Sequence, residues 1–466
     1  MLPTRMIILL VAIIFSLCAP VAAENFKVEL DNNHLSLTAT EVPLRAILLE
    51  LVSQGILIKI DPQINPHVTA HFSNRPLQQA LESIVKPASH LLIWQKNPNQ
   101  PATTNLVISE IKIFQSNRMD KIQLLVKPKP RRIVKNKDGI YYVENEILLQ
   151  ILPGTDIREL RKLLKNYGAV LALNQALPDV VTLIFPDESD IFSIAGEIKK
   201  KLGLNLAEPN YAYPGHTPVR YTNTLPSAAL MAENVAATTS SIAILDSGID
   251  KAAGFDQIVL SSLDAITPDA QITDTLGHGT QMAFIASGLV KPYGSAGNNE
   301  KLIPIIPIKV FDEQGYTTSI NIMESINFAL ENDAKVMSLS WGTEIKSDFM
   351  ENAFAQASSS GLIIIASAGN EPIGTPVYPA AYPSVIGVGA LEPDGARWDQ
   401  SNYGDFVTLY ASGFANMPVG HNGDPGLYAG TSISAALVAN SAAHYLQEHP
   451  HASRQEVSSY LQNRYK

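Results

Sequence analysis

The sequence predicts an α/β domain, with a parallel sheet covered by helices on both faces, preceded by two small α+β domains. Residues 222–466 alternate short apolar runs with segments of helical period, which is typical of a parallel sheet buried between helices. Two earlier stretches each combine amphipathic helices with β-prone runs. The 466 residues suit about three domains, at roughly 150 residues per domain.

The composition is that of a globular protein. Hydrophobic residues make up 46% and charged residues 17% of the chain, so the composition does not indicate disorder. The formal net charge is −10, whereas a nucleic-acid-binding protein usually presents a basic face. We therefore expect no nucleic-acid partner.

The N-terminus has the pattern of a secretory signal peptide over residues 1–23. Arg5 precedes an apolar run at Met6–Leu17, and Pro20–Ala23 offers small residues for cleavage after Ala23. The alternative is an uncleaved membrane anchor, although the run is shorter than the ~20 residues that span a bilayer. The single cysteine, Cys18, lies in this segment, so the mature chain would have no disulfide and no thiol nucleophile. We expect an exported protein, periplasmic or extracellular.

Residues 24–116 predict a small α+β domain with an internal pseudo-repeat. Pro43 and Pro76 each open a helical pattern, and proline suits the first helical position because the missing N–H has no partner there. β-prone runs follow at Ile56–Ile60 and Leu91–Trp94. The apolar positions with helical spacing are Leu44, Ile47, Leu48 and Leu51 in the first helix, and Leu77, Ala80, Leu81 and Ile84 in the second.

The pattern "VPLRAILLEL…GILIKIDPQI…VTAHFSNRPLQQALESIV" in this segment resembles the short N-terminal domain of secretins and TonB-dependent receptors. In that family the domain mediates protein contacts in the periplasm. The resemblance implies a partner protein in the cell envelope. A small packing domain without a partner remains the alternative.

Residues 117–143 are expected to form a basic linker. Such a run usually marks a solvated, extended connector. A nucleic-acid patch is the alternative, but no aromatic residues interleave with the charges. The basic residues, which alternate with Pro128 and Pro130, are Lys121, Lys127, Lys129, Arg131, Arg132, Lys135 and Lys137.

Residues 144–213 predict a second α+β domain of βαββαβ order. Strands are expected at Glu146–Leu152 and Val180–Ile184, and helices at Asp156–Asn166 and Ser189–Leu202. The segments "ILLQILPGTD" and "AEPNY" resemble the propeptide of subtilisin-like proteases. In that family the domain assists folding and then fills the active-site cleft with its C-terminal strand. An unrelated ferredoxin-like domain remains the alternative.

Residues 222–466 contain the parallel-sheet domain. Helices are expected at Ile320–Leu330 and Phe349–Ser359. Ligands of such sheets bind beyond the carboxyl ends of the strands. The predicted strands are Ile242–Leu245, Ile305–Phe311, Lys335–Ser340, Leu362–Ala368 and Ser384–Ala390.

Four polar residues stand at strand ends or helix starts of this domain. Asp246 ends an apolar strand, where a carboxylate can orient an imidazole, and His278 opens a helix between two glycines. Ser432 begins another helix, whose N-terminal N–H groups and dipole would stabilise an oxyanion. Asn370 follows Gly369 at a strand end and could donate to the same oxyanion. Each residue alone has a plainer interpretation, such as a turn or a helix cap, but the ordered set favours a catalytic site.

The motifs "ILDSGID", "GHGT", "MSLSWG", "ASAGN", "YPAAYPSVIGVGA" and "AGTSISAALVA" resemble the subtilisin-like (subtilase) family across Ser241–Leu446. The chain order Asp, His, Ser is that of subtilisin. The resemblance implies a subtilisin-like fold and a catalytic triad of Asp246, His278 and Ser432, with Asn370 in the oxyanion hole. It also implies that Ser340, Trp341 and Gly342 form the strand that pairs with substrate and borders the first specificity pocket.

By the same resemblance, we expect a serine endopeptidase acting on proteins or peptides. It would be made as a self-processing zymogen, with its own propeptide as an intramolecular inhibitor, and cut within Tyr211–Val235. No cofactor is required for this chemistry. Calcium is common in the family, but no compact Asp/Asn loop identifies its ligands, and we assign no metal-binding residues.

Two other functions compete with this interpretation. One is a binding or signalling protein in which the first small domain carries the function and the catalytic fold is a degenerate scaffold. The intact set of Asp246, His278, Asn370 and Ser432 argues against it. The other is an esterase, but Ser432 lacks the Gly-x-Ser-x-Gly elbow of such enzymes.

Overall fold

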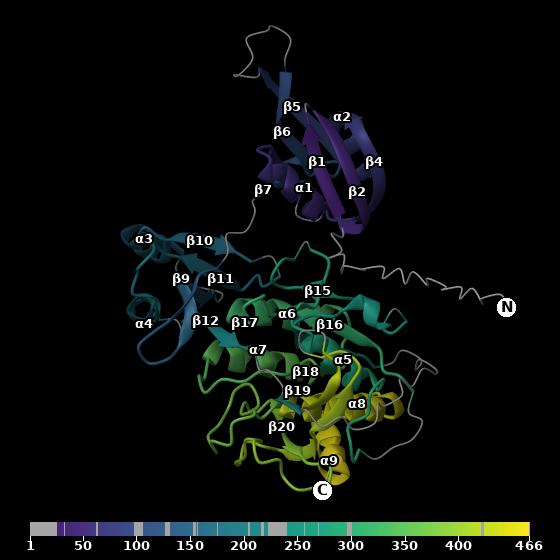
Figure 1. Cartoon of the computed structure of the whole chain (residues 1–466). Helices are drawn as coiled ribbons and strands as arrows, with labels where there is room; N and C mark the ends of the chain where they lie inside the picture. Colours follow the sequence, from purple (N-terminus) through teal and green to yellow (C-terminus); the bar gives the residue numbers. More distant parts are fainter. Residues whose placement is uncertain are drawn as a thin grey trace, which may run out of the picture. The chain divides into compact units, whose positions relative to one another are not determined.

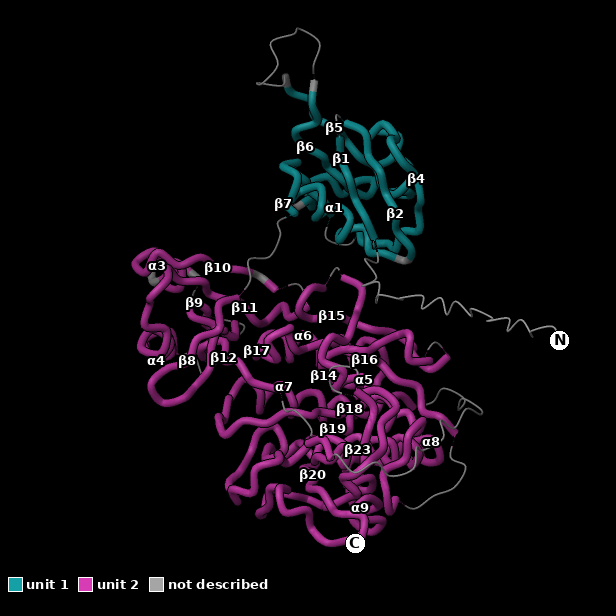
Figure 2. Tube along the Cα trace, viewed as in Figure 1, with its two compact units in different colours: residues 1–127 teal, residues 128–466 magenta. Residues whose placement is uncertain are grey.

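The computed structural model describes residues 26–465 except 32, 62–63, 97–105, 126–130, 152–154, 156, 175, 204–205, 216–218, 222–239, 256, 269, 296–300 and 421–423. The expected signal peptide, residues 1–23, lies outside the described residues. The chain divides into two compact units, residues 1–127 and 128–466 (Figures 1 and 2). Among the described helices, none is long and apolar enough to cross a membrane.

Unit 1 contains two sheets and two helices around one apolar core. The sheets have the orders β1-β2-β4 and β5-β6-β3-β7. The elements are β1 (Phe26–Asp31), β2 (His34–Pro43), α1 (Leu44–Ser53), β3 (Leu57–Ile60), β4 (His67–Pro76), α2 (Leu77–Ile84), β5 (Ser89–Lys96), β6 (Leu106–Phe114), the 3-10 turn η1 (Met119–Lys121) and β7 (Gln123–Leu125).

The two helices of unit 1 arise in the same way, in line with the predicted pseudo-repeat. Each follows a strand that ends in proline, and Pro43 and Pro76 are the N-caps rather than the first helical residues. This one-residue shift places each proline, which has no N–H to donate, just before the helix. The positions with helical spacing are buried in both helices, so the helical periodicity correctly identified the core faces.

The N-terminal part of unit 2 has the predicted βαββαβ order. Its strands form an antiparallel sheet of order β10-β11-β9-β12, with β8 on β9. The elements are β8 (Ile133–Lys135), β9 (Tyr141–Gln150), α3 (Ile157–Tyr167), β10 (Val170–Leu173), β11 (Val180–Ile184), α4 (Ile191–Leu202) and β12 (Ala207–Pro214). We call this part, residues 133–214, the small domain.

The basic stretch at 117–143 is not simply a solvated connector, as we had expected. Strand β7 pairs with β3 of unit 1, and β8 pairs with β9 of the small domain. Arg131 forms an ion pair with Glu146 at 3.2 Å, and Arg132 with Glu144 at 2.9 Å. The prediction of a solvated run missed these ion pairs because the acidic partners of both arginines lie on the next strand, β9.

The C-terminal part of unit 2 is built on a seven-stranded sheet of order β15-β16-β14-β18-β19-β20-β21, in which every neighbouring pair is parallel. Its strands are β14 (Ile242–Asp246), β15 (Leu263–Asp264), β16 (Ile305–Lys309), β18 (Val336–Leu339), β19 (Ile363–Ser367), β20 (Val385–Leu391) and β21 (Leu409–Ser412). The remaining elements are η2 (Lys251–Ala253), α5 (His278–Ser287), β17 (Tyr316–Thr318), α6 (Ser319–Glu331), α7 (Asp348–Ser359), β22 (Phe414–Met417), β23 (Gly426–Ala429), α8 (Thr431–Glu448) and α9 (Arg454–Arg464).

Helices cover both faces of this sheet, as predicted. Ile242 and Ile244 of β14 share an apolar cluster with residues of α5 and α8, whereas Ala243 and Leu245 share another with residues of α6 and α7. Alternate side chains of a strand point to opposite faces, so the two pairs of helices lie on opposite sides (Figure 1). The predicted fold class is confirmed.

Residues of the small domain belong to the same apolar cluster as α6 and α7. Leu148, Val180, Leu206 and Tyr213 are its buried members from the small domain. Strand β12 also pairs with β17, which extends the antiparallel sheet of the small domain into the C-terminal part of unit 2. The two parts of unit 2 are therefore joined by a shared core and a shared sheet.

Candidate active site

Asp246 is the last residue of β14, at the carboxyl edge of the sheet, and its side chain is buried. Its Oδ1 accepts a hydrogen bond from the backbone N–H of Ser247 at 2.7 Å and lies 2.7 Å from Nδ1 of His278. A carboxylate can only accept, so His278 carries its proton on Nδ1. Its Nε2 is then unprotonated and able to accept a proton.

His278 Nε2 is buried and has no hydrogen-bond partner among the described residues. Burial lowers the pKa of His278, but the charge and the hydrogen bond of Asp246 and the charge of Asp274 outweigh burial. The net effect raises the pKa of His278 above its usual value of 6.5. A buried imidazole with one nitrogen fixed by a carboxylate and the other unpaired has the arrangement of a general base.

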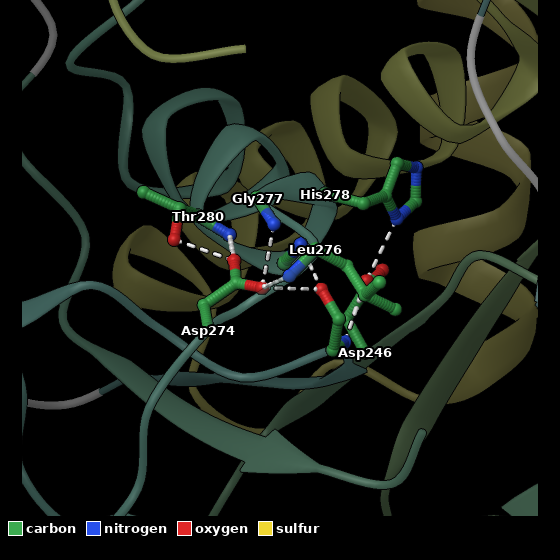
Figure 3. A network of polar contacts seen from close by, with 8 residues as sticks. Asp246, Asp274, Leu276, Gly277, His278 and Thr280 are labelled. Atoms are coloured by element: carbon green, nitrogen blue, oxygen red, sulfur yellow. Dashed lines mark hydrogen bonds and ion pairs between the residues drawn. The ribbon is translucent and has the colours of Figure 1, made fainter. Parts of the chain in front are cut away.

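Asp274 fixes the first turn of α5, the helix that His278 opens. Its carboxylate accepts five hydrogen bonds, from Ser247 Oγ, Leu276 N, Gly277 N, Thr280 N and Thr280 Oγ1. Figure 3 shows this carboxylate facing the first turn of the helix. An acidic group that accepts N–H donors at a helix N-terminus stabilises that turn. We had not singled out Asp274 from the sequence; its position four residues before His278 was the available signal.

Two glycines of this region are required by backbone packing. A Cβ on Gly279 would lie 2.3 Å from the carbonyl oxygen of Gly248. Gly248 itself has a φ of +115°, and a Cβ there would lie 2.1 Å from the carbonyl oxygen of Thr273. The glycine after His278 therefore allows the helix start to approach the loop after β14.

Ser432 is the second residue of α8 and is buried at the start of that helix. Its neighbour Thr431 binds Asn370, whose Oδ1 accepts from Thr431 N at 2.9 Å and Thr431 Oγ1 at 2.8 Å. Thr431 Oγ1 in turn accepts from the N–H of Gly369 at 3.2 Å. Since its Oδ1 is held in this way, Asn370 presents its amide Nδ2 as a donor beside the start of α8.

These contacts bring the predicted residues to one edge of the sheet. Asp246 follows β14, and Asn370 lies just after β19 at the same carboxyl edge. His278 is bonded to Asp246, and Ser432 adjoins the residue bonded to Asn370. His278 and Ser432 begin α5 and α8, two helices that pack in one apolar cluster.

Ser340, Trp341 and Gly342 follow β18, and all three are buried. Trp341 forms an antiparallel bridge with Gly215, the residue after β12. Strand β12 itself pairs with β17, through Ala212 with Thr318 and Tyr213 with Thr317. The segment predicted to pair with substrate is therefore paired with the chain's own residues.

Among the described residues, no group of three or more His, Cys, Asp or Glu side chains is placed to hold a metal ion. The calcium site suggested by the family resemblance stays a prediction without assigned ligands.

Comparison with known proteins places the C-terminal part of the chain in a known family. The sequence profile of the subtilase family matches residues 237–465. Subtilisin DY from Bacillus licheniformis is 30% identical over 224 residues, which cover 47% of this chain and 81% of that protein. Alkaline elastase YaB from Bacillus sp. (strain YaB) is 28% identical over 222 residues, which cover 48% of this chain and 58% of the elastase.

A solved structure shows the same fold. Fervidolysin from Fervidobacterium pennivorans, a keratinolytic enzyme related to subtilisin, matches with a TM-score of 0.56 at 21% sequence identity. The match covers 72% of this chain and 60% of that chain, so this chain spans less than two thirds of both fervidolysin and the elastase. Because the family profile matches only residues 237–465, the fold similarity extends to residues before 237. By its sequence, the chain belongs to the subtilase family.

Proposed function

We propose that the protein hydrolyses peptide bonds in proteins, with Ser432 as nucleophile, His278 as general base and Asp246 as the group that orients His278. One observation carries this proposal. The hydrogen bond of 2.7 Å between His278 Nδ1 and Asp246 Oδ1 is buried, and it leaves His278 Nε2 without a partner among the described residues. Hydrogen bonds between nucleophile and base are often loose in free enzymes and tighten when substrate binds.

The chemistry follows from these positions. Ser432 Oγ attacks the scissile carbonyl carbon while its proton passes to His278 Nε2. The tetrahedral intermediate then collapses, the C–N bond breaks, and the leaving amine takes the proton from His278. Water next attacks the acyl-enzyme with the same help from His278 and releases the acid. The carboxylate of Asp246 stabilises the imidazolium that forms in each half of the reaction.

The oxyanion of the intermediate would be stabilised by two donors. One is the Asn370 amide Nδ2, which is oriented because Oδ1 is held by Thr431. The other is the backbone N–H of Ser432 at the N-terminus of α8, where the helix dipole favours negative charge. Both donors would then be oriented before substrate arrives, which is the condition for effective transition-state stabilisation.

We also propose that residues 144–213 form an intramolecular propeptide and inhibitor. Residues 212–215 lie between β17 and Trp341 as an added antiparallel strand. This is the position expected for a substrate, because added strands bind mainly through main-chain hydrogen bonds. A bound strand here would exclude other peptides until it is removed.

Two polar residues of β12 also bind the small domain to the C-terminal part of unit 2, because they cap helices there. Glu208 accepts from Ser347 Oγ at 2.8 Å and from the N–H of Asp348 at 3.0 Å, at the start of α7. Asn210 Oδ1 accepts from the N–H of Ile320 at 3.3 Å, in the first turn of α6. These contacts satisfy N–H groups that have no partner within their own helices.

The contacts also narrow the proposed site of self-cleavage. Gly215 is paired with Trp341, and Val219 is paired with Ala429, shortly before Ser432 in the chain. The predicted range, Tyr211–Val235, partly lies outside the described residues. We propose that the cut lies between Gly215 and Val219, because both residues are paired with the C-terminal part of unit 2 and Ala429, the partner of Val219, comes shortly before Ser432 in the chain.

For the remaining parts of the chain we propose export and a partner. Residues 1–23 would direct the protein to the periplasm or the outside of the cell and then be removed. Residues 24–116 would bind a protein of the cell envelope. Both proposals rest on the sequence patterns described above.

The test is the intact mass of the wild type and of Ser432→Ala after expression, with each treated with a fluorophosphonate probe. We expect the wild type to lose its N-terminal domains, to begin between His216 and Val219, and to gain the mass of one probe. Ser432→Ala should stay full length and unlabelled. If the wild type also stays full length and unlabelled, after cleavage by added protease has been tried, the proposal is wrong.

A further inference from the structure

Arg131 joins the small domain to helix α6, although it comes before the small domain in the chain. Its Nε lies 3.2 Å from both carboxylate oxygens of Glu146 on β9, and its Nη1 donates to Asn321 Oδ1 on α6 at 2.9 Å. Glu146 and Asn321 are buried, whereas the side chain of Arg131 is 37% exposed. One guanidinium therefore binds a strand of the small domain and a helix of the C-terminal part of unit 2.

Glu146 is itself part of the contact with α6. Its Oε2 accepts from Asn210 Nδ2 at 2.7 Å, and Asn210 Oδ1 accepts from the N–H of Ile320 at 3.3 Å. The Glu146 carboxylate thus lies between two side chains that both bind the first turns of α6. Of these two side chains, only Arg131 carries a positive charge.

The same guanidinium lines a cavity of about 470 Å³ between the small domain and α6. The acidic residues that line this cavity are Glu146, Glu324 and Glu331, and Arg131 is the only basic residue among the described residues of the lining. Burial raises the pKa of Glu324 above its usual value, and the hydrogen bond of Asn174 and the charge of Arg131 oppose this shift. Without Arg131, docking of the small domain would bring acidic side chains together with no positive charge beside them.

The next residue, Arg132, has a different environment. It pairs with Glu144 of β9 at 2.9 Å, and its side chain is 74% exposed. An exposed ion pair of this kind contributes little to stability, whereas removal of one partner of a buried pair leaves an uncompensated charge. The two adjacent arginines therefore allow a matched comparison.

We infer that Arg131 stabilises the docking of the small domain on α6, so that the intramolecular inhibitor begins in the linker that follows unit 1 rather than at residue 144. The inference rests on the proposed role of the small domain as propeptide and inhibitor. It adds a residue outside the stretch that resembles a protease propeptide. Any change that separates this guanidinium from Glu146 and Asn321 would favour release of the small domain and earlier activity.

The experiment measures hydrogen exchange of backbone amides in the full chain, in the Ser432→Ala background, which prevents self-cleavage. Two amides report docking directly, because they belong to helices of the C-terminal part of unit 2 and donate to side chains of β12. The N–H of Ile320 donates to Asn210, and the N–H of Asp348 donates to Glu208 at 3.0 Å. Where exchange reports the opening equilibrium, Arg131→Gln should raise the exchange rates of both amides about tenfold, which corresponds to ~1.4 kcal/mol.

Arg132→Gln is the matched control, because it removes the same charge one residue further along the chain and loses only the exposed pair with Glu144. It should change the two exchange rates less than about twofold. Asn321→Ala should raise both rates in the wild-type background. It should raise them less in the Arg131→Gln background, because the two residues share one hydrogen bond.

Amides of the β10–β11 pair, which lies within the small domain, distinguish undocking from unfolding. They should exchange at the wild-type rate in Arg131→Gln. Unchanged rates at Ile320 and Asp348 in this variant would overturn the inference, and so would an equal rise in the β10–β11 pair, because the small domain would then unfold rather than undock. The peptidase function is tested separately, since a chain with Ser432 intact that takes no fluorophosphonate label would overturn that function without changing these exchange rates.

Discussion

Replacing Asp274 by asparagine tests whether the hydrogen bonds that Asp274 accepts position His278, the proposed general base. Asparagine keeps the size of the side chain but loses the charge and one acceptor oxygen. In its best orientation it retains the three bonds that Oδ1 accepts, from Ser247, Leu276 and Gly277. In that orientation the asparagine NH₂ group faces Thr280 N and Thr280 Oγ1, which both donate to Asp274 Oδ2 in the wild type.

The loss in the free energy of unfolding follows from the two hydrogen bonds to Thr280. The N–H of Thr280 is buried, and leaving such a donor unsatisfied costs about 1–3 kcal/mol. The Thr280 hydroxyl loses a hydrogen bond to a charged group, but it still accepts from the N–H of Asp250 at 2.9 Å. Asp274 is partly exposed, so water relieves part of the loss. We therefore expect Asp274→Asn to lower the free energy of unfolding by ~3 kcal/mol.

The same substitution should change the pH dependence of activity. The charge of Asp274 is one of the influences that raise the pKa of His278, after burial, which lowers it, and Asp246, which raises it. Without that charge the pKa of His278 falls. Because the neutral imidazole is the active form, the acid limb of kcat/KM should move to lower pH. A variant that lost stability without any change in the pKa of His278 would keep the acid limb of kcat/KM at the wild-type pH.

Stability would be measured by denaturant unfolding in the Ser432→Ala background, which prevents self-digestion, and activity by the pH profile of kcat/KM. Asp250→Asn is the control, because asparagine can still accept the exposed hydrogen bond from the N–H of Ala252. Its stability should change by less than about 0.5 kcal/mol. If Asp274→Asn also loses less than that and its acid limb does not move, the positioning role assigned to Asp274 is refuted.

Three further predictions follow from single contacts. Asn370→Ala should lower kcat by about 100- to 1,000-fold with little change in KM. Steady-state kinetics on the purified enzyme measures this. A loss of kcat below tenfold would mean that Asn370 does not stabilise the oxyanion. Gly279→Ala should prevent folding, because the new Cβ would lie 2.3 Å from the carbonyl oxygen of Gly248, and a soluble variant with a wild-type circular dichroism spectrum would contradict this. Burial raises the pKa of Glu208 above 4.5, although the hydrogen bonds from Ser347 and Asp348 lower it. Docking of the small domain on the C-terminal part of unit 2 therefore favours protonated Glu208. This docking should weaken as the pH rises from 4.5 toward the raised pKa. The rate at which activity appears after processing should therefore rise with pH over that window, and Glu208→Gln, which stays neutral, should flatten this rise; an unchanged profile would show that Glu208 is not responsible.

Much of the fold could be predicted from the sequence because it depends on local patterns. The strands of the parallel sheet are continuous apolar runs, and α1 and α2 show their buried faces at helical spacing. The same applies to the candidate catalytic residues. Asp246, His278 and Ser432 each stand at a strand end or a helix start within a short motif, and their order in the chain, together with the resemblance to the subtilase family, led to their prediction as catalytic residues.

Contacts between distant segments could not be predicted in this way. Tyr213 and Ser319 are 106 residues apart in the chain, and Glu208 and Ser347 are 139 apart. Nothing in the local sequence around Tyr213 or Glu208 distinguishes these buried side chains, which bind residues of the C-terminal part of unit 2, from exposed side chains of the small domain. Arg131, which we had assigned to a solvated linker, forms an ion pair with Glu146 for the same reason.

The sequence by itself determined the α/β fold class, the order of the small domain's elements and the residues proposed for catalysis, because hydrophobic periodicity and short motifs are local properties of the chain. Only the tertiary structure decided that Asp274 binds the first turn of the helix that His278 opens, that the Tyr213 hydroxyl is hydrogen-bonded to Ser319, and that β12 pairs with β17. These features arise when the sheet edge, the helix starts and the small domain come together, and that arrangement depends on the packing of the whole unit.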